Sequence, residues 1–368
     1  MNILEVLDRI PDFRVVGRCK YRLGLVLGLA LAAMMGGATS YRQMARFASA
    51  HRDWLRRAFF PDLREIPSHD VFRNVFVGVA PGYFCTLFSF WAAFLRAPRG
   101  RERACMDGKA LRGAARPDGT IPYVISLWSE TGGFVLGQAL VPEKTNEIAA
   151  MPLLIEKLIR EGDILSADAA GCQRKNAKLA VERKADYLFA LKGNQGSTLD
   201  EVRLLLESLL QEHPEELETA ESLDKGHGRM ERRTCHLCRN VAYWREGKNA
   251  WPGIRGVCMV VNERTVKGKG AEREPLFYIT SLDVGAAELL GLIRAHWGIE
   301  NRLHYVKDVD FGEDTCRARA GNSAMNLSTM RHILLNLINR RRPKDESVKE
   351  FHRSLAWDQT LLAQLLGA

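Results

Sequence analysis

The chain has 368 residues, 46% of them hydrophobic and 26% charged, which is the balance of an ordinary globular protein and excludes wholesale disorder and collagen-like repeats. This length predicts about two domains, or one large domain that carries an insertion. Because 53 Lys and Arg outnumber 44 Asp and Glu, the formal charge is +9, which favours a polyanionic partner such as nucleic acid.

The first part of the chain is predicted to be all-helical. The stretch from Leu23 to Ala38 is uncharged and mostly apolar, but it is shorter than the roughly 20 residues that a membrane span requires, so we expect a buried helix and no membrane partner. Apolar residues then recur at helical spacing through SYRQMARFASAHRDWLRRAFF. The Pro/Gly/Arg-rich stretch APRGRER begins at residue 97 and marks a boundary. We therefore predict an N-terminal helical domain, DNA-binding or associated, over residues 1–97.

After this boundary the pattern changes to alternating strands and helices. Short β-rich runs occur in ACMDGKAL, YVISLWSE and FVLGQALV, and the last two are joined by a Thr-Gly-Gly hairpin signal. An amphipathic helix follows in NEIAAMPLLIEKLIREG, then a strand in DILSADAAG, a helix in QRKNAKLAVERKA and a buried strand in DYLFALKGNQ. The predicted order over residues 98–197 is βββαβαβ, which places the chain in the α/β class.

The region over residues 198–284 is predicted as an inserted segment with β-strands, preceded by an acidic helix. Its Cys235 and Cys238 form a C-x-x-C, which suggests either half of a zinc site or ordinary strand cysteines; the lack of a second ligand pair at regular spacing favours strand cysteines. The eight scattered cysteines fit a reducing compartment, so we expect a cytoplasmic protein. Residues 285–368 are predicted to be helical and basic.

Three carboxylates stand out by their position. Asp107 and Asp168 end two predicted strands, and Glu300 shares a helix face with Ile293 and Trp297, which we expect to pack toward the sheet. A carboxylate on such a face is costly unless it is paired, and two divalent cations held by all three acids would pair it. Each acid also has a plainer interpretation.

These plainer interpretations are a turn residue for Asp107, an N-cap for Asp168, and an ion-pair partner of Arg294 or Arg302 for Glu300. Four other acids rival Glu300 as the third ligand: Asp308, Asp310, Glu313 and Asp314. We expect the last two to lie on a mobile segment beyond the helix end at Phe311-Gly312.

The chain also contains, in this order, MDGKALRGA, EKTNEIAAMPLLIEKL, SADAAGCQ, ADYLFALKGNQ, GHGRMERR, YITSL and IRAHWGIENRLHYVKDVDFGED. These stretches resemble the ordered motifs of the DDE transposases of bacterial insertion sequences, in the branch that contains the H-repeat-associated proteins. The resemblance covers nearly the whole chain. It implies an RNase H-like core (βββαβαβ–insertion–α), with an all-α N-terminal domain, a β-rich insertion and a final core helix followed by basic C-terminal helices.

The resemblance also implies that the acidic triad is Asp107, Asp168 and Glu300. They would hold Mg²⁺ or Mn²⁺, with two ions expected, for DNA strand cleavage and transfer. Lys307 matches a lysine that related transposases carry seven residues after the third acid, whereas Ile293 and His296 stand where related enzymes carry Tyr and Arg.

We expect the partner to be double-stranded DNA, both as the terminal inverted repeats of the element and as the target, bound by a homo-oligomer that is a dimer on DNA at the bacterial nucleoid. Two other functions remain open: an RNase H-like nuclease without strand transfer, and a domesticated DNA-binding protein without catalysis. The predicted DNA contacts, with solvated surface side chains as the alternative, are Lys109, Arg112, Lys144, Lys192, Asn194, Gln195, Arg229, Arg232 and Lys307.

Overall fold

The computed structural model describes residues 2–15, 17–96, 101–141, 147–226, 229–247, 249–266 and 272–367. The chain divides into two compact units. Unit 1 comprises Met1–Pro98, Gly108–Ala150 and Glu300–Ala368, and unit 2 comprises Arg99–Asp107 and Met151–Ile299.

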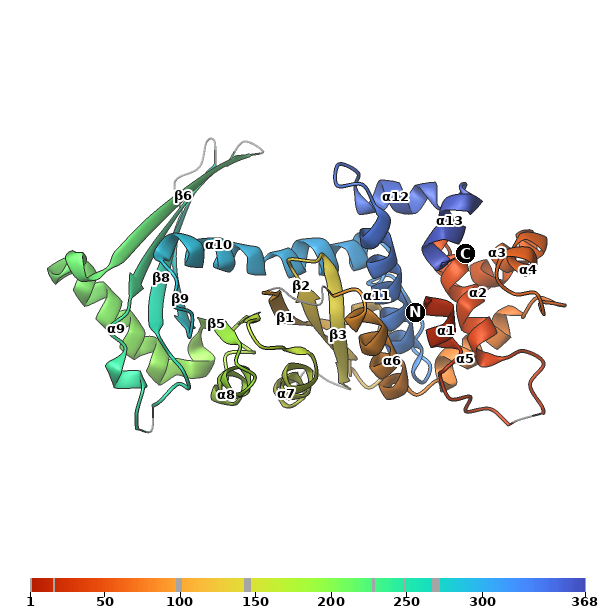
Figure 1. The fold of residues 1–368 in the computed structure, drawn as a ribbon, viewed down its shortest axis with the longest axis horizontal. Coiled ribbons are helices and arrows are strands. Elements are labelled where there is room, and N and C mark those ends of the chain that lie inside the picture. The colour runs from red at the N-terminus through yellow and green to blue at the C-terminus, as the bar shows by residue number, and fades with distance from the viewer. Residues whose placement is uncertain are drawn as a thin grey trace. The chain divides into compact units, whose positions relative to one another are not determined.

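Unit 1 begins with six helices, which confirms the helical prediction for this part of the chain (Figure 1). They are α1 (Ile3–Leu7), α2 (Leu23–Met35), α3 (Tyr41–Ala50), α4 (Arg52–Ala58), α5 (His69–Gly78) and α6 (Pro81–Ala93). Every residue of α2 is buried, so the apolar stretch is a core helix as expected. Within the described residues, no single helix is both long and apolar enough to cross a membrane.

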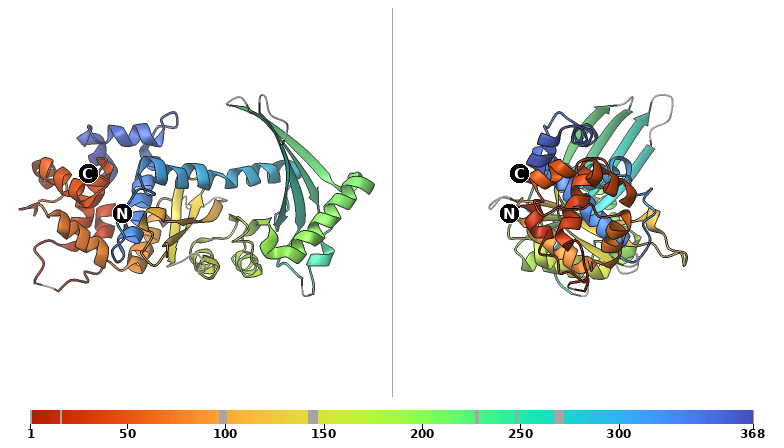
Figure 2. Two further views of the ribbon diagram at one scale, coloured as in Figure 1. Left: turned by 180° about the vertical axis from the view of Figure 1, so that it is seen from behind. Right: turned by 90° about the vertical axis from the view of Figure 1, so that its right-hand side faces the viewer.

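The rest of unit 1 packs a β-hairpin against C-terminal helices. Strands β2 (Tyr123–Ser129) and β3 (Phe134–Val141) pair antiparallel, and the buried helix α11 (Ser323–Arg341) packs on β3 and α6. Helices α12 (Val348–Ser354) and α13 (Gln359–Leu366) follow. The Asn2 side-chain amide donates to the Gly367 carbonyl at 3.2 Å, so the two ends of the chain meet in this unit (Figure 2).

Unit 2 is built on a mixed sheet. Strand β1 (Arg103–Ala110), whose last residues belong to unit 1, pairs parallel with β4 (Ile164–Ala167), and β4 pairs parallel with β5 (Asp186–Leu191). Antiparallel strands then continue from β5 in the order β9 (Glu272–Thr280), β8 (Gly256–Val266), β7 (Arg229–Cys238) and β6 (Glu218–Gly226). The helices are α7 (Glu147–Leu158), whose first residues belong to unit 1, α8 (Arg174–Glu182), α9 (Gly196–Glu212) and α10 (Ala286–His296).

The element order β1, β2, β3, α7, β4, α8, β5 confirms the predicted βββαβαβ pattern. The β-rich segment after residue 198 does not form a separate sheet, because β9 pairs with β5 through Leu188–Leu191 and so extends the same sheet. Cys235 and Cys238 are buried in β7, as expected for strand cysteines.

The segment after α10 departs from regular helix. Two π-helical turns, Glu300–His304 and Val306–Asp310, follow α10 instead of a continued α-helix. Our prediction that Trp297 lies in the core is wrong, because its side chain is 58% exposed. A rotation of about 100° per residue holds only for an α-helix. Because α10 ends at His296, the face predicted from Ile293 does not extend to Trp297 or to the π-helical turns.

Candidate functional site

Asp107 and Asp168 follow directly on paired positions of two neighbouring strands. In the parallel pair β1–β4, Met106 is opposite Ala167, so the next residue of each strand is one of the two aspartates. Neighbouring strands lie about 4.8 Å apart, and residues in register on parallel strands point to the same face. Both aspartates are half-buried. The two acids therefore lie on neighbouring strands in unit 2 as predicted, and Asp168 follows the end of β4. The prediction that Asp107 ends its strand is wrong, because β1 continues to Ala110.

The loop after Asp168 has a fixed geometry. Asp168 Oδ1 accepts hydrogen bonds from the backbone N–H groups of Ala170 (3.0 Å) and Gly171 (3.3 Å), whereas the N-cap of α8 is Gln173. Asp168 thus stabilises a turn and is not the N-cap of the following helix. A Cβ on Gly171 would lie 2.4 Å from the Cβ of Ala167, so this close approach requires glycine.

The loop after β5 is bound to the loop after β4. The Asn194 side-chain amide donates to the Ala169 carbonyl at 2.5 Å, and that of Gln195 donates to the Cys172 carbonyl at 2.9 Å. Both amides are therefore used within the protein. They hold the segment that carries Asp168, in addition to any contact with DNA that we predicted for them.

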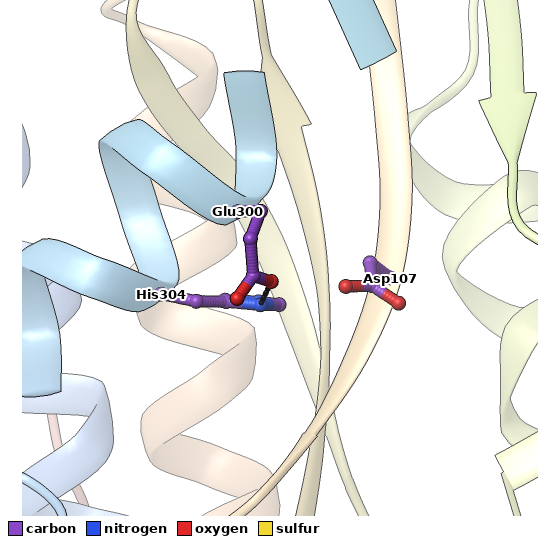
Figure 3. Close-up of side chains that lie close together, drawn as sticks. All are labelled: Asp107, Glu300 and His304. Atoms are coloured by element: carbon purple, nitrogen blue, oxygen red, sulfur yellow. Dashed lines mark hydrogen bonds and ion pairs between the residues drawn. The ribbon is translucent and has the colours of Figure 1, made fainter. Parts of the chain in front are cut away.

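Glu300 lies next to His304, which the sequence analysis did not single out (Figure 3). His304 Nδ1 donates to Glu300 Oε2 at 3.2 Å. Within unit 1, Glu300 and His304 therefore each offer a ligand-type atom on the same turn. The only signal in the sequence was the spacing of four residues between Glu300 and His304, which is too common on helices to be specific.

The donor set fits a divalent cation. Carboxylate oxygens suit Mg²⁺ and Mn²⁺, and an imidazole nitrogen suits a first-row transition metal. The hydrogen bond from His304 lowers the pKa of Glu300, burial opposes this, and the charges of His304, Lys109 and Arg112 lower the pKa further. Glu300 is therefore an ionised acceptor at neutral pH.

The predicted burial of Glu300 is wrong, because its side chain is 58% exposed. The π-helical turn that begins at this residue changes the direction of its side chain relative to the α-helical projection. Its two expected ion-pair partners are engaged elsewhere: Arg294 pairs with Asp224 at 2.8 Å and Arg302 with Glu130 at 3.6 Å. Because Glu300 is exposed, its carboxylate is accessible to solvent and ions. The cost of burying its charge, which we inferred from the sequence, does not arise.

Unit 1 also contains a buried charge cluster, which we call the Glu313 cluster: Lys109, Lys307, Glu313 and Arg331. Glu313 accepts from Lys307 Nζ at 3.1 Å and from Lys109 Nζ at 3.2 Å, and Arg331 lies 3.5 Å away. Lys109 also pairs with Asp308. Our expectation that Glu313 lies on a mobile segment is wrong: it is 3% exposed, because three cations compensate its buried charge.

The cations control the ionisation of this glutamate. Burial alone raises the pKa of Glu313, but Lys307, Arg331 and Lys109 together hold it well below its usual range. Burial lowers the pKa of Lys307 to about 8, against the opposing charge of Glu313. At neutral pH the two side chains therefore form an ion pair.

Lys307, a predicted phosphate contact, is 1% exposed. Its Nζ donates to Ser328 Oγ and His332 Nε2, each at 2.9 Å. Burial lowers the pKa of His332 well below its ordinary value, so its ring is neutral and donates through Nδ1 to Gln138 Oε1. Lys307 is therefore part of a buried hydrogen-bonded network. Its predicted contact with DNA rests only on the resemblance of the sequence to the DDE transposase motifs.

The other predicted DNA contacts differ in their surroundings. Arg112, Lys192 and Asn194 are exposed, and Arg232 is exposed but paired with Glu221 at 2.8 Å. Lys144 lies outside the described residues, and for Arg229 only the position in β7 is described.

Comparisons with known proteins agree on one family. Residues 4–92 match the DDE_Tnp_1-associated model, and residues 99–337 match the Transposase DDE domain model. The "H repeat-associated putative transposase YhhI" of Escherichia coli (strain K12) is 32% identical over 100% of this chain and 98% of its own length. The "Uncharacterized protein in dhlA 3'region" of Xanthobacter autotrophicus is 34% identical over 71% of this chain and 88% of its own length.

Among solved structures, the piggyBac transposase synaptic complex with hairpin DNA aligns with 99% of this chain and 77% of that chain. The identity is 12% and the TM-score is 0.41, a likeness from which we draw nothing.

Proposed function

Because the chain belongs to the DDE transposases, we propose that it cuts and joins DNA at the ends of a mobile element, using Asp107, Asp168 and Glu300 as its acidic triad. The single observation that carries this proposal is the pairing of Met106 with Ala167 on neighbouring parallel strands, because the next residue of each chain segment is one of the two aspartates. The parallel strands β1, β4 and β5 and the antiparallel hairpin β2–β3 fit an RNase H-like core.

In the proposed mechanism the triad holds divalent ions, Mg²⁺ or Mn²⁺ and two in number, which when bound supply Lewis acidity to the attacking and leaving oxygens. Asp107 and Asp168 provide carboxylates from the sheet, and Glu300 provides the third, oriented by its hydrogen bond from His304. No protein side chain becomes covalently attached to DNA, so the same triad serves hydrolysis of a strand and attack by the resulting 3′-hydroxyl. Joining two ends requires more than one active site, so we propose a dimer on DNA, in the cytoplasm at the nucleoid.

Full-length protein incubated with Mg²⁺ and duplexes that carry the DNA flanking its own gene tests this function. We expect strand breaks with free 3′-hydroxyl groups, followed by joined products when target DNA is added, and neither product in EDTA. Breaks without joined products would identify a nuclease. Binding without breaks would identify a DNA-binding protein that has no catalysis.

We also expect duplex binding to survive loss of the acids and to weaken steeply with salt. The excess of basic residues implies contacts with several phosphates, and each neutralised phosphate contributes a slope of about −0.9 in log affinity against log salt. Titration of a labelled end duplex at several NaCl concentrations, with wild-type and Asp168→Asn proteins, measures this slope. Salt-independent binding would contradict the prediction.

A further inference from the structure

A cavity of about 610 Å³ lies in unit 1 and is lined by none of the three acids, and we call it the arginine pocket. Its volume is in the range of about 300–1,000 Å³ that is typical of pockets that hold small ligands. The pocket is lined by the start of α3, by α5, by the loop over residues 312–320 and by the start of α11. The lining residues used below are Tyr41, Met44, Arg73, Arg317, Arg319 and Leu327.

Three guanidinium groups give this pocket its charge. Arg73, Arg317 and Arg319 all line it, and no aspartate or glutamate is among its lining residues. Within the described part of the chain, none of the three forms an ion pair; Arg319 donates through Nε to the Gly113 carbonyl at 3.3 Å. Three uncompensated guanidinium groups around one cavity form a site for an anion, and their planar donor pattern matches phosphate.

The floor of the pocket is apolar. Met44 and Leu327 are buried there, and the Tyr41 ring packs on Phe76 with ring centroids 5.7 Å apart. Burial raises the pKa of Tyr41 to about 12, so its hydroxyl stays protonated at neutral pH. The pocket therefore offers positive charge at its rim and an aromatic and aliphatic surface inside.

The loop that carries Arg317 and Arg319 is held in place. Asn322 donates from its backbone N–H to the Val77 carbonyl at 3.1 Å, and from its side chain to the Val79 carbonyl at 3.1 Å. Gly321 has a positive φ of 50°, and a Cβ there would lie 2.9 Å from the Val77 carbonyl oxygen. These contacts with the end of α5 form the pocket before any ligand binds.

Resting on the proposed function, we propose that the arginine pocket binds one unpaired nucleotide of a DNA strand, with the guanidinium groups on its phosphate and the apolar floor against its base. A duplex presents phosphates, sugars and base edges but hides the faces of its bases, because these are paired and stacked. An unpaired nucleotide presents an anion and an apolar ring face together, which is the combination that this pocket provides.

Anisotropy with a labelled oligothymidylate, which cannot pair with itself, tests this proposal beside a blunt end duplex. Arg317→Ala with Arg319→Ala is expected to lower the affinity for oligothymidylate by about tenfold or more, since a hydrogen bond to a charged group contributes about 1.5 kcal/mol or more. Arg340→Ala with Arg341→Ala, on the exposed end of α11, removes the same charge outside the pocket and is the matched control. Ala318→Trp fills the pocket, keeps all three arginines, and is expected to weaken oligothymidylate binding while sparing the duplex.

The pocket would be overturned as a nucleotide site if its double-alanine variant and the control double-alanine variant lost the same affinity for oligothymidylate. Unchanged oligothymidylate binding by Ala318→Trp would also overturn it. Wild-type protein that binds and cuts the duplex but does not bind oligothymidylate would also overturn it and leave the proposed function intact. Failure to bind or cut either DNA would overturn the proposed function itself.

Discussion

Glu300→Gln is expected to reduce metal-dependent DNA cleavage by about a hundredfold or more. Glutamine keeps the size and the hydrogen-bonding capacity of the side chain but removes the negative charge that a divalent cation requires. Such an ion supplies several kcal/mol of stabilisation in the transition state, and each 1.36 kcal/mol corresponds to a tenfold change in rate. Because Glu300 is exposed, the substitution leaves the core unchanged, and stability should change by less than about 0.5 kcal/mol.

Single-turnover cleavage of an end duplex, with Mg²⁺ and with Mn²⁺, measures this effect. Glu288→Gln changes an exposed glutamate in the first turn of α10. It makes the same chemical change away from the acids, and this variant should cleave at the wild-type rate.

Asp107→Asn and Asp168→Asn should show the same loss of cleavage as Glu300→Gln. Asp308→Asn should retain most activity, because Lys109 keeps its contacts with Glu313 and Asp314. An active Glu300→Gln protein beside an inactive Asp308→Asn protein would move the third ligand to Asp308.

Glu313→Ala is expected to lower the free energy of unfolding by about 3–5 kcal/mol. The substitution leaves Lys307 and Arg331 buried without their common anion, and removing one partner of a buried ion pair costs about this much. Urea denaturation followed by circular dichroism gives the change. Glu221→Ala, which breaks the exposed pair with Arg232, is the matched control and should change stability far less, because water screens an exposed ion pair.

The pH dependence provides a second measure of the same cluster. Because the pKa of Glu313 is held below its unfolded value, its contribution is present above about pH 4.3 and is lost as the pH falls toward the folded-state pKa. The difference in stability between wild type and Glu313→Ala should therefore shrink below about pH 4. A constant difference down to acidic pH would show that Glu313 contributes by packing alone.

Adding Lys307→Met to Glu313→Ala should recover part of the lost stability, because it removes one of the buried charges that Glu313→Ala leaves without a partner.

Local patterns in the sequence determined the secondary structure and two of the three acids. The apolar run from Leu23 and the helical spacing after it predict the helices of unit 1, and the alternation after residue 103 predicts the order βββαβαβ. Asp168 follows the end of β4 as the sequence predicts. Asp107 lies inside β1 and not at its end, but the parallel pairing of Met106 with Ala167 still brings the two positions onto neighbouring strands. These features depend on residues close to one another in the chain.

The tertiary structure alone decided what surrounds these elements. The end of α10 at His296 and the π-helical turn that begins at Glu300 have no signature in the hydrophobic period. A projection that continued the α-helix therefore placed Trp297 and Glu300 in the core. Glu313 is separated from Lys109 by 204 residues, and no spacing rule connects such partners. The arginine pocket likewise joins the start of α3 to a loop more than two hundred residues later. Burial and charge compensation arise from contacts between distant segments, and these form only when the whole chain packs.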